Sequence, residues 1–355
     1  MPSERNFLEP PGSANEIRFD ETGGHWVLFA PGRTARPNDF KAQKAAAAPD
    51  CSRDSCPFCP GREGETPPEV ASLRDNESVP DSPGWRIRVV PNKYPALNRP
   101  TAPLFSTAAE ESGPSRAGLG IHEVVIDGPD HDRDWADLPV DHLGEVLALS
   151  RDRLRIIEKD PSIAYIQLFK NKGGEAGASL CHPHTQILAL PVVPGQVAAE
   201  AAFMVRRGIS AGACFACRFI ADEEPGPRLV WAGREFVALA PFASRFSYET
   251  HILPRRHAAS FSDISDGEII PLARTMREVL RRLRVSAGDP SYHLVLRQAP
   301  VLRTGDENDQ HVSRFVHWRF EILPVLGAVA GFEWGTGCFI NPVLPEQAAA
   351  SLRRS

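Results

Sequence analysis

The sequence lacks the features that would place it in a membrane or on a nucleic acid. No apolar run is long enough to cross a bilayer, and the start, MPSERNFLEP, has no apolar signal core. The formal net charge of -5 gives no electrostatic reason to expect nucleic acid or an anionic membrane as a partner. Only seven cysteines occur, and in such a protein metal binding or reactivity explains them better than disulfides. We therefore expect a cytoplasmic protein.

The features of the chain come twice in the same order. The first half has CPFC at 56–59, strands and a turn that ends in His131, an amphipathic helix within 140–160, and two short apolar runs. The second half has CFAC at 214–217, two strands and a turn that ends in His257, a helix within 264–283, and two more such runs. This order predicts an α+β fold made by internal duplication, in which each half is an antiparallel sheet with one main helix.

The length of 355 residues allows two domains. We expect a disordered N-terminus at residues 1–14, a catalytic first half at 15–191, a linker at 192–212 and a second half at 213–355.

The segment His182-Pro-His184-Thr-Gln186 carries the strongest chemical signal. Alternate side chains of a strand leave on the same face, so these two histidines and the glutamine should point the same way. Pro183 cannot donate to a ladder, which places the segment at the start or edge of a strand. Histidine serves mainly as base, nucleophile or metal ligand, so the pattern favours a working site over a polar strand end.

Each half offers a Cys₂His₂ set. Two cysteines at C-x-x-C spacing can hold one edge of a tetrahedral zinc, and the alternative of a redox pair lacks a thioredoxin-like βαβ context. The repeated order predicts two structural zinc sites. Their ligands are Cys56, Cys59, His131 and His182 in the first half, and Cys214, Cys217, His257 and His317 in the second. The remaining cysteines are interpreted as a loop thiol (Cys51), a core thiol (Cys181) and a buried thiol (Cys338).

If His182 binds metal, His184 is left free. A neutral imidazole can attack phosphorus and form a covalent intermediate. Gln186 can donate to a phosphoryl oxygen, where charge must be stabilised. The upstream segment NKGGEAGAS, residues 171–179, is able to approach phosphates but is not a P-loop.

Several motifs together resemble the galactose-1-phosphate uridylyltransferase family of the histidine-triad superfamily. They are CPFCPG, VVPNKYPAL, GPDH, FKNKGGEAGASLCHPHTQ and GFEWGTGCFINP. The resemblance implies that His184 attacks the α-phosphorus of UDP-glucose, that glucose 1-phosphate leaves, and that galactose 1-phosphate takes the uridylyl group in a ping-pong reaction. It also implies that Cys56, Cys59, His131 and His182 bind zinc, and that Gln186 marks a transferase, since the hydrolase branch has a third histidine there.

The resemblance also implies substrate-binding residues. They are Arg33 and Arg36 near the phosphates, Phe58, Asn92 and Tyr94 at the nucleoside, Asn171 and Ser179 in the phosphate loop, and Phe332 and Glu333 at the hexose. The implied partners are a nucleotide sugar and a sugar 1-phosphate, with a homodimer as the expected assembly.

One departure leaves the nucleotide open. In well-known uridylyltransferases the last strand carries more than one metal-binding histidine, whereas here it has His317 but Arg319 and Glu321 after it. This strand and the second C-x-x-C pair look more like the ADP-glucose phosphorylase branch. The first interpretation is therefore a uridylyltransferase acting on UDP-glucose. The alternatives are an adenylyltransferase of the ADP-glucose phosphorylase kind, a nucleotide hydrolase, and a non-catalytic, zinc-stabilised nucleotide-binding protein.

Overall fold

The computed structural model describes residues 15–21, 23–35, 52–75, 77–99, 117–303 and 305–355. Arg36, Cys51 and the predicted disordered N-terminus at 1–14 lie outside these residues. Among the described residues, no helix combines the length and the apolar character needed to span a membrane.

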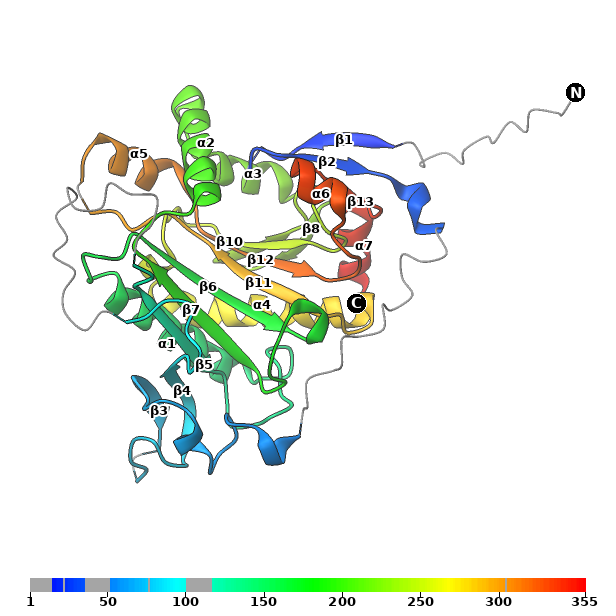
Figure 1. Cartoon of the computed structure of the whole chain (residues 1–355). Coiled ribbons are helices and arrows are strands. Elements are labelled where there is room, and N and C mark those ends of the chain that lie inside the picture. The colour runs from blue at the N-terminus through cyan, green and yellow to red at the C-terminus, as the bar shows by residue number, and fades with distance from the viewer. Residues whose placement is uncertain (1–14, 22, 36–51, 76, 100–116, 304) are drawn as a thin grey trace, which may run out of the picture.

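A single antiparallel sheet of ten strands forms the centre of the molecule (Figure 1). Its strand order is β3-β4-β5-β7-β6-β11-β12-β10-β9-β8. The first five strands are β3 (Ala71–Arg74), β4 (Trp85–Pro91), β5 (Ile121–Ile126), β6 (Tyr165–Lys172) and β7 (His184–Leu190). The other five are β8 (Leu229–Ala232), β9 (Phe236–Leu239), β10 (Thr250–Pro254), β11 (Tyr292–Arg297) and β12 (Arg319–Pro324).

The two halves have the same topology. Three strands, a long helix and two more strands follow one another in each, and the helices are α1 (Val140–Ile157) and α4 (Asp266–Ala287). The predicted α+β class with antiparallel sheets is confirmed, and the repeated order is what a duplication would leave. The halves are not two separate sheets, however. β6 pairs with β11 through Tyr292↔Lys172 to Val295↔Phe169, so two five-stranded sheets join edge to edge.

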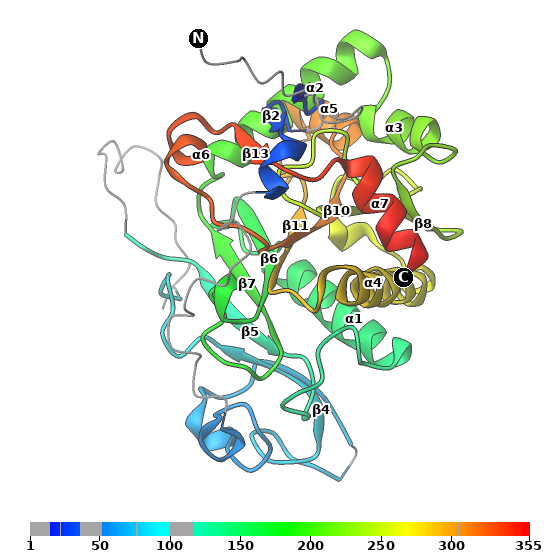
Figure 2. The same cartoon turned by 90° about the vertical axis from the view of Figure 1, so that its right-hand side faces the viewer.

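Helices α1 and α4 lie side by side on one face of the sheet (Figure 2). Their apolar stripes pack on alternate strand residues, so that Leu143 of α1, Leu272 of α4 and Ile187 and Ala189 of β7 share the main core. A capping box of Ser265 and Glu268 begins α4. Because strand side chains alternate, the residues between the core positions of β7 point to the opposite face of the sheet.

The remaining elements were not all expected from the sequence. A small sheet of order β1-β2-β13 contains β1 (Glu16–Phe19), β2 (Trp26–Phe29) and β13 (Phe339–Asn341). The expected linker at 192–212 is mostly helix α2 (Gly195–Ala211), and four further helices accompany it: α3 (Phe215–Glu223), α5 (Glu307–Phe315), α6 (Gly331–Thr336) and α7 (Pro345–Arg354). Five short 3₁₀ turns are η1 (Pro31–Ala35), η2 (Arg53–Ser55), η3 (Glu63–Glu65), η4 (Gly174–Ala176) and η5 (Phe261–Asp263).

Candidate functional site

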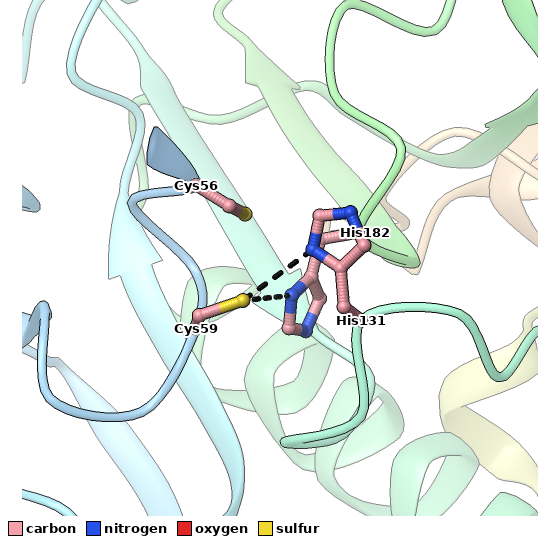
Figure 3. Close-up of side chains that lie close together, drawn as sticks. All are labelled: Cys56, Cys59, His131 and His182. Carbon is pink, nitrogen blue, oxygen red and sulfur yellow. Dashed lines mark hydrogen bonds between the residues drawn. The ribbon is translucent and has the colours of Figure 1, made fainter. Parts of the chain in front are cut away.

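Four predicted metal ligands meet at the start of β7 (Figure 3). Cys56 and Cys59 lie in the turn after η2, His131 follows β5, and His182 precedes β7. The Sγ of Cys59 is 3.4 Å from Nδ1 of His131 and 3.6 Å from Nδ1 of His182. Sulfur and nitrogen ligands bound at about 2.3 and 2.1 Å around a tetrahedral zinc are about 3.6 Å apart. The four side chains therefore fit a zinc ion.

The protonation of this cluster also suits a cation. Nε2 of His182 lies 2.7 Å from the carbonyl oxygen of Gly128, which can only accept, so the proton is on Nε2 and the Nδ1 lone pair faces the cysteines. Burial lowers the pKa of His182 to about 4, and burial raises the pKa of the Cys59 thiol to about 11. Without a cation the Cys59 thiol would be costly to ionise here, and a metal would supply the missing positive charge.

The second half has a cluster of the same design. Sγ of Cys217 is 3.5 Å from Nδ1 of His257 and 3.5 Å from Nδ1 of His317, and Cys214 lies 3.8 Å from His317. Nε2 of each histidine donates to a main-chain carbonyl at 2.9 Å, that of Ser313 for His257 and that of Pro254 for His317. This set also fits zinc. Occupancy of either cluster stays a prediction.

The other cysteine predictions were partly wrong. Cys181 is exposed and disulfide-bonded, so it is not a core thiol. Cys338 is a free thiol that is partly exposed instead of buried, because it follows the short helix α6 at the molecular surface.

His184 is the first residue of β7 and is held as a neutral imidazole. Its Nδ1–H donates to the main-chain carbonyl of His182 at 2.9 Å, which leaves the lone pair on Nε2. The residue is buried, with 6% exposed, and the Phe58 ring stands edge-on to the imidazole with ring centroids 5.4 Å apart. Burial lowers the pKa of His184. A neutral imidazole with a free nitrogen is the form that acts as a nucleophile.

Gln186 lies two residues along the same face of β7. Its Oε1 is 3.0 Å from Nε2 of His122 on β5, and its amide nitrogen makes no hydrogen bond within the described part of the chain. His184 and Gln186 are thus side by side, as the alternation predicts, with one amide group able to donate to a ligand.

A buried charge network lies beneath these two residues. Thr185, between them, donates to Oδ1 of Asp127 at 3.0 Å, and Lys170 of β6 donates to Oδ2 of Asp127 at 3.0 Å. Lys170 also pairs with Asp134 at 3.2 Å, so the lysine is flanked by two carboxylates. This network fixes the main chain at the point where β7 presents its functional side chains.

Four of the predicted substrate-binding residues lie around the same end of the sheet. Phe58 packs on the His182 and His184 rings, and Asn92 accepts the N–H of Tyr94, whose side chain is 83% exposed. The register of β6 and β7 includes Phe169↔Gln186, and Asn171 follows Phe169 by two residues on β6, where it pairs with His293 of β11.

The remaining ones are more scattered. Ser179 is exposed in the segment before β7. Arg33 is in η1 after β2, and Phe332 and Glu333 are on α6, which packs against β13 of the small sheet. Oε2 of Glu333 accepts the Ala330 N–H at 3.1 Å and so caps the N-terminus of α6. These three residues therefore belong to segments next to the small sheet, whereas His184 lies on β7 of the ten-stranded sheet.

Two histidines of the site were missed by the sequence analysis. His122 of β5 contacts Gln186, and His293 of β11 donates from Nδ1 to Oδ1 of Asn171 at 2.9 Å. Alternation along GIHEVVI and YHLVLR would have placed both on the face opposite the main core. Their partners depend on strand pairing, which the sequence does not state.

The second half has no counterpart of His184. Arg319 stands two residues after the predicted ligand His317, as His184 follows His182. Its Nη2 donates to Glu200 of α2 at 2.7 Å and lies 2.7 Å from Glu321. An arginine engaged with two carboxylates cannot act as a nucleophile, so the described residues of the second half offer no imidazole at the position that corresponds to His184.

Comparisons with known proteins agree with these motifs. A family model described as galactose-1-phosphate uridyl transferase, N-terminal domain, matches residues 11–194. ADP-glucose phosphorylase of Arabidopsis thaliana is 36% identical over 345 residues, which are 95% of this chain and 92% of that protein. Galactose-1-phosphate uridylyltransferase of Thermotoga maritima is 30% identical over 96% of this chain and 98% of its own.

Solved structures give the same result. The crystal structure of the Arabidopsis thaliana ADP-glucose phosphorylase with bound ADP-glucose matches with a TM-score of 0.81 and 33% identity, over 96% of this chain and 99% of that one. A uridylyltransferase structure matches with a TM-score of 0.70 and 31% identity, over 96% and 97% of the two chains.

Proposed function

Because this chain belongs to the galactose-1-phosphate uridylyltransferase family, we propose that it is a nucleotidyltransferase that works through a covalent nucleotidyl-histidine at His184. The observation that carries the proposal is the neutral His184 imidazole. Its Nδ1–H is engaged with the His182 carbonyl, its Nε2 lone pair has no hydrogen-bond partner among the described residues, and the Gln186 amide is beside it on the same face.

The reaction follows from these atoms. The Nε2 lone pair attacks the α-phosphorus of a nucleoside diphosphate glucose, and the bond from that phosphorus to the bridging oxygen breaks. Glucose 1-phosphate leaves with both bonding electrons. An acceptor phosphate oxygen then attacks the same phosphorus, and the imidazole leaves as the neutral group it was. The Gln186 amide donates to a phosphoryl oxygen as charge develops on it.

We propose ADP-glucose as the preferred donor. The 36% relative and the structure with a TM-score of 0.81 are both ADP-glucose phosphorylase, and the last strand of this chain departs from the uridylyltransferase pattern at Arg319. UDP-glucose, the donor expected first from the sequence, is the second candidate, supported by the 30% identical relative from Thermotoga maritima. Phosphate is the acceptor that fits the first donor, and galactose 1-phosphate the acceptor that fits the second.

Zinc bound by the two Cys₂His₂ sets would stabilise the fold without entering the chemistry. The set that contains His182 would hold the main-chain carbonyl that orients His184. We also propose that the protein forms a homodimer and is located in the cytoplasm.

The test is to incubate the purified protein separately with ADP-glucose and UDP-glucose labelled at the α-phosphorus. We expect acid-labile label on the protein, with faster labelling by ADP-glucose. Faster labelling by UDP-glucose would assign the uridylyl donor instead. A protein that takes no label from either donor would be the non-catalytic binding protein. Label that passes only to water would indicate the hydrolase.

A further inference from the structure

His122 has three polar neighbours whose hydrogen-bonding capacities are known. Its Nδ1 is 3.1 Å from the main-chain N of Ala96, and its Nε2 is 3.0 Å from Oε1 of Gln186. Nε2 is also 3.1 Å from Nδ2 of Asn92. The residue lies on β5, where Val124 pairs with Gln186 and His122 with Leu188, so it reaches Gln186 diagonally across the strands.

These neighbours determine which ring nitrogen carries the proton. A main-chain N–H can only donate, so Nδ1 of His122 must offer its lone pair to Ala96. The neutral ring then has its proton on Nε2. This N–H needs an acceptor, and the Gln186 oxygen is in place. The oxygen of the Asn92 amide accepts the main-chain N–H of Tyr94, so the Asn92 NH₂ group is the part that faces His122. In this tautomer that NH₂ group and the Nε2–H are both donors, and their contact at 3.1 Å is not a hydrogen bond.

The direction of this bond settles the orientation of the Gln186 amide. An amide can present either its oxygen or its nitrogen to a ligand, and the two differ in chemistry. With the oxygen held by His122, the NH₂ group is left to face the ligand. A phosphoryl group bound at His184 carries negative oxygens, which an NH₂ group stabilises and a carbonyl oxygen repels.

We infer that His122 is a positioning residue that keeps the Gln186 amide oxygen turned away from the reacting phosphorus and its NH₂ group turned toward it. This inference rests on the proposed function, since it concerns the stabilisation of the nucleotidyl transfer at His184. His122 itself touches Gln186 and not the reacting atoms.

A matched pair of substitutions separates the two nitrogens of the ring. In His122→Asn, the amide oxygen replaces Nδ1 and keeps the Ala96 contact, but no donor reaches Gln186. In His122→Gln, the longer side chain places an NH₂ donor where Nε2 was. The readout is exchange of labelled glucose 1-phosphate into ADP-glucose and into UDP-glucose, without acceptor. We expect His122→Asn to slow the exchange about ten-fold or more with little change in donor affinity, and His122→Gln to retain most of it.

The double variant tests the route of the effect. If His122 acts through Gln186, then His122→Asn should cause no further loss in a Gln186→Ala background. A full additional loss there, or equal rates for His122→Asn and the wild type, would overturn the inference. Wild-type protein that shows no exchange with either donor would refute the proposed function, and the inference with it.

A measurement independent of activity examines the tautomer. Long-range ¹⁵N–¹H spectra of histidine-labelled protein should show His122 with a bare Nδ1 and a protonated Nε2, its signals being those absent from His122→Asn. A proton on Nδ1 would contradict the assigned orientation, whatever the exchange assay gives.

Discussion

The main-chain carbonyl of His182 accepts the Nδ1–H of His184 at 2.9 Å, so a residue of the metal cluster orients the ring of the proposed nucleophile. The same His182 presents its Nδ1 to Cys59 and its Nε2–H to Gly128. One short segment thus links the predicted metal ligands to the proposed nucleophile. The consequence is that loss of His184 and loss of His182 should have different effects.

His184→Gly should abolish exchange between donor and glucose 1-phosphate while zinc content and fold remain, because the metal ligand is the other histidine. The substitution leaves a cavity the size of an imidazole, so a preformed nucleoside 5′-phosphorimidazolide should restore the second half-reaction. His182→Gly should lose metal and stability together. Exchange that persists in His184→Gly, or initial-rate plots that intersect instead of running parallel, would contradict the covalent mechanism.

Zinc should be found at about two ions per chain, since each half has a Cys₂His₂ set of fitting geometry. Cys56→Ser should lose one ion and Cys214→Ser the other, each with reduced stability, because binding of structural zinc contributes to folding free energy. Cys338→Ser, outside both clusters, is the control and should keep two. Elemental analysis of the purified proteins decides, and a wild type without zinc would rule out both sites.

Gln186→His should raise hydrolysis of the nucleotidyl intermediate relative to transfer. The hydrolase branch differs at this position by a histidine, and an imidazole can accept a proton from attacking water. The ratio of nucleoside monophosphate to transfer product measures the effect. Gln186→Ala is the matched control, because it removes the amide without adding a base. Equal ratios in the two variants would show that the imidazole is not responsible.

Glu249 should make an acid-sensitive contribution to stability. Burial alone would raise its pKa, but the Arg245 guanidinium 2.7 Å away and His251 outweigh burial and hold the pKa at about 2, below the ordinary value of 4.5. A lowered pKa stabilises the folded state above the unfolded value, and this stabilisation is lost as pH falls from about 4.5 toward 2.

The comparison of Glu249→Gln with the wild type tests this. Urea unfolding at pH 7 should show a loss of about 3–5 kcal/mol for the variant, since Arg245 loses a buried partner. The difference between the two proteins should shrink at pH 3. Glu77→Gln, at an exposed glutamate, serves as the control and should unfold like the wild type at both pH values. A difference for Glu249→Gln that is independent of pH would refute the assignment.

The sequence alone determined the features that depend on neighbours along the chain. The spacing of Cys56 and Cys59 in one turn already brings together two side chains that could bind one side of an ion, and alternation along β7 places His184 and Gln186 on one face. The periodic apolar residues of α1 and α4 identify both main helices for the same reason. The family resemblance, carried by contiguous motifs, is local in this sense as well.

Only the tertiary structure decided which distant residues meet. Pairing of β6 with β11 makes one sheet from two. The main-chain hydrogen bonds that join these strands do not depend on side-chain identity, so the sequence pattern of neither strand predicts the pairing. His122 finds Gln186 only through the pairing of β5 with β7, and Glu200 of α2 finds Arg319 only when the helix packs there. These contacts join residues that are far apart in the sequence, so they depend on how the chain folds in space. The first contact orients the Gln186 amide. The second engages Arg319, the residue of the second half that stands at the position of His184.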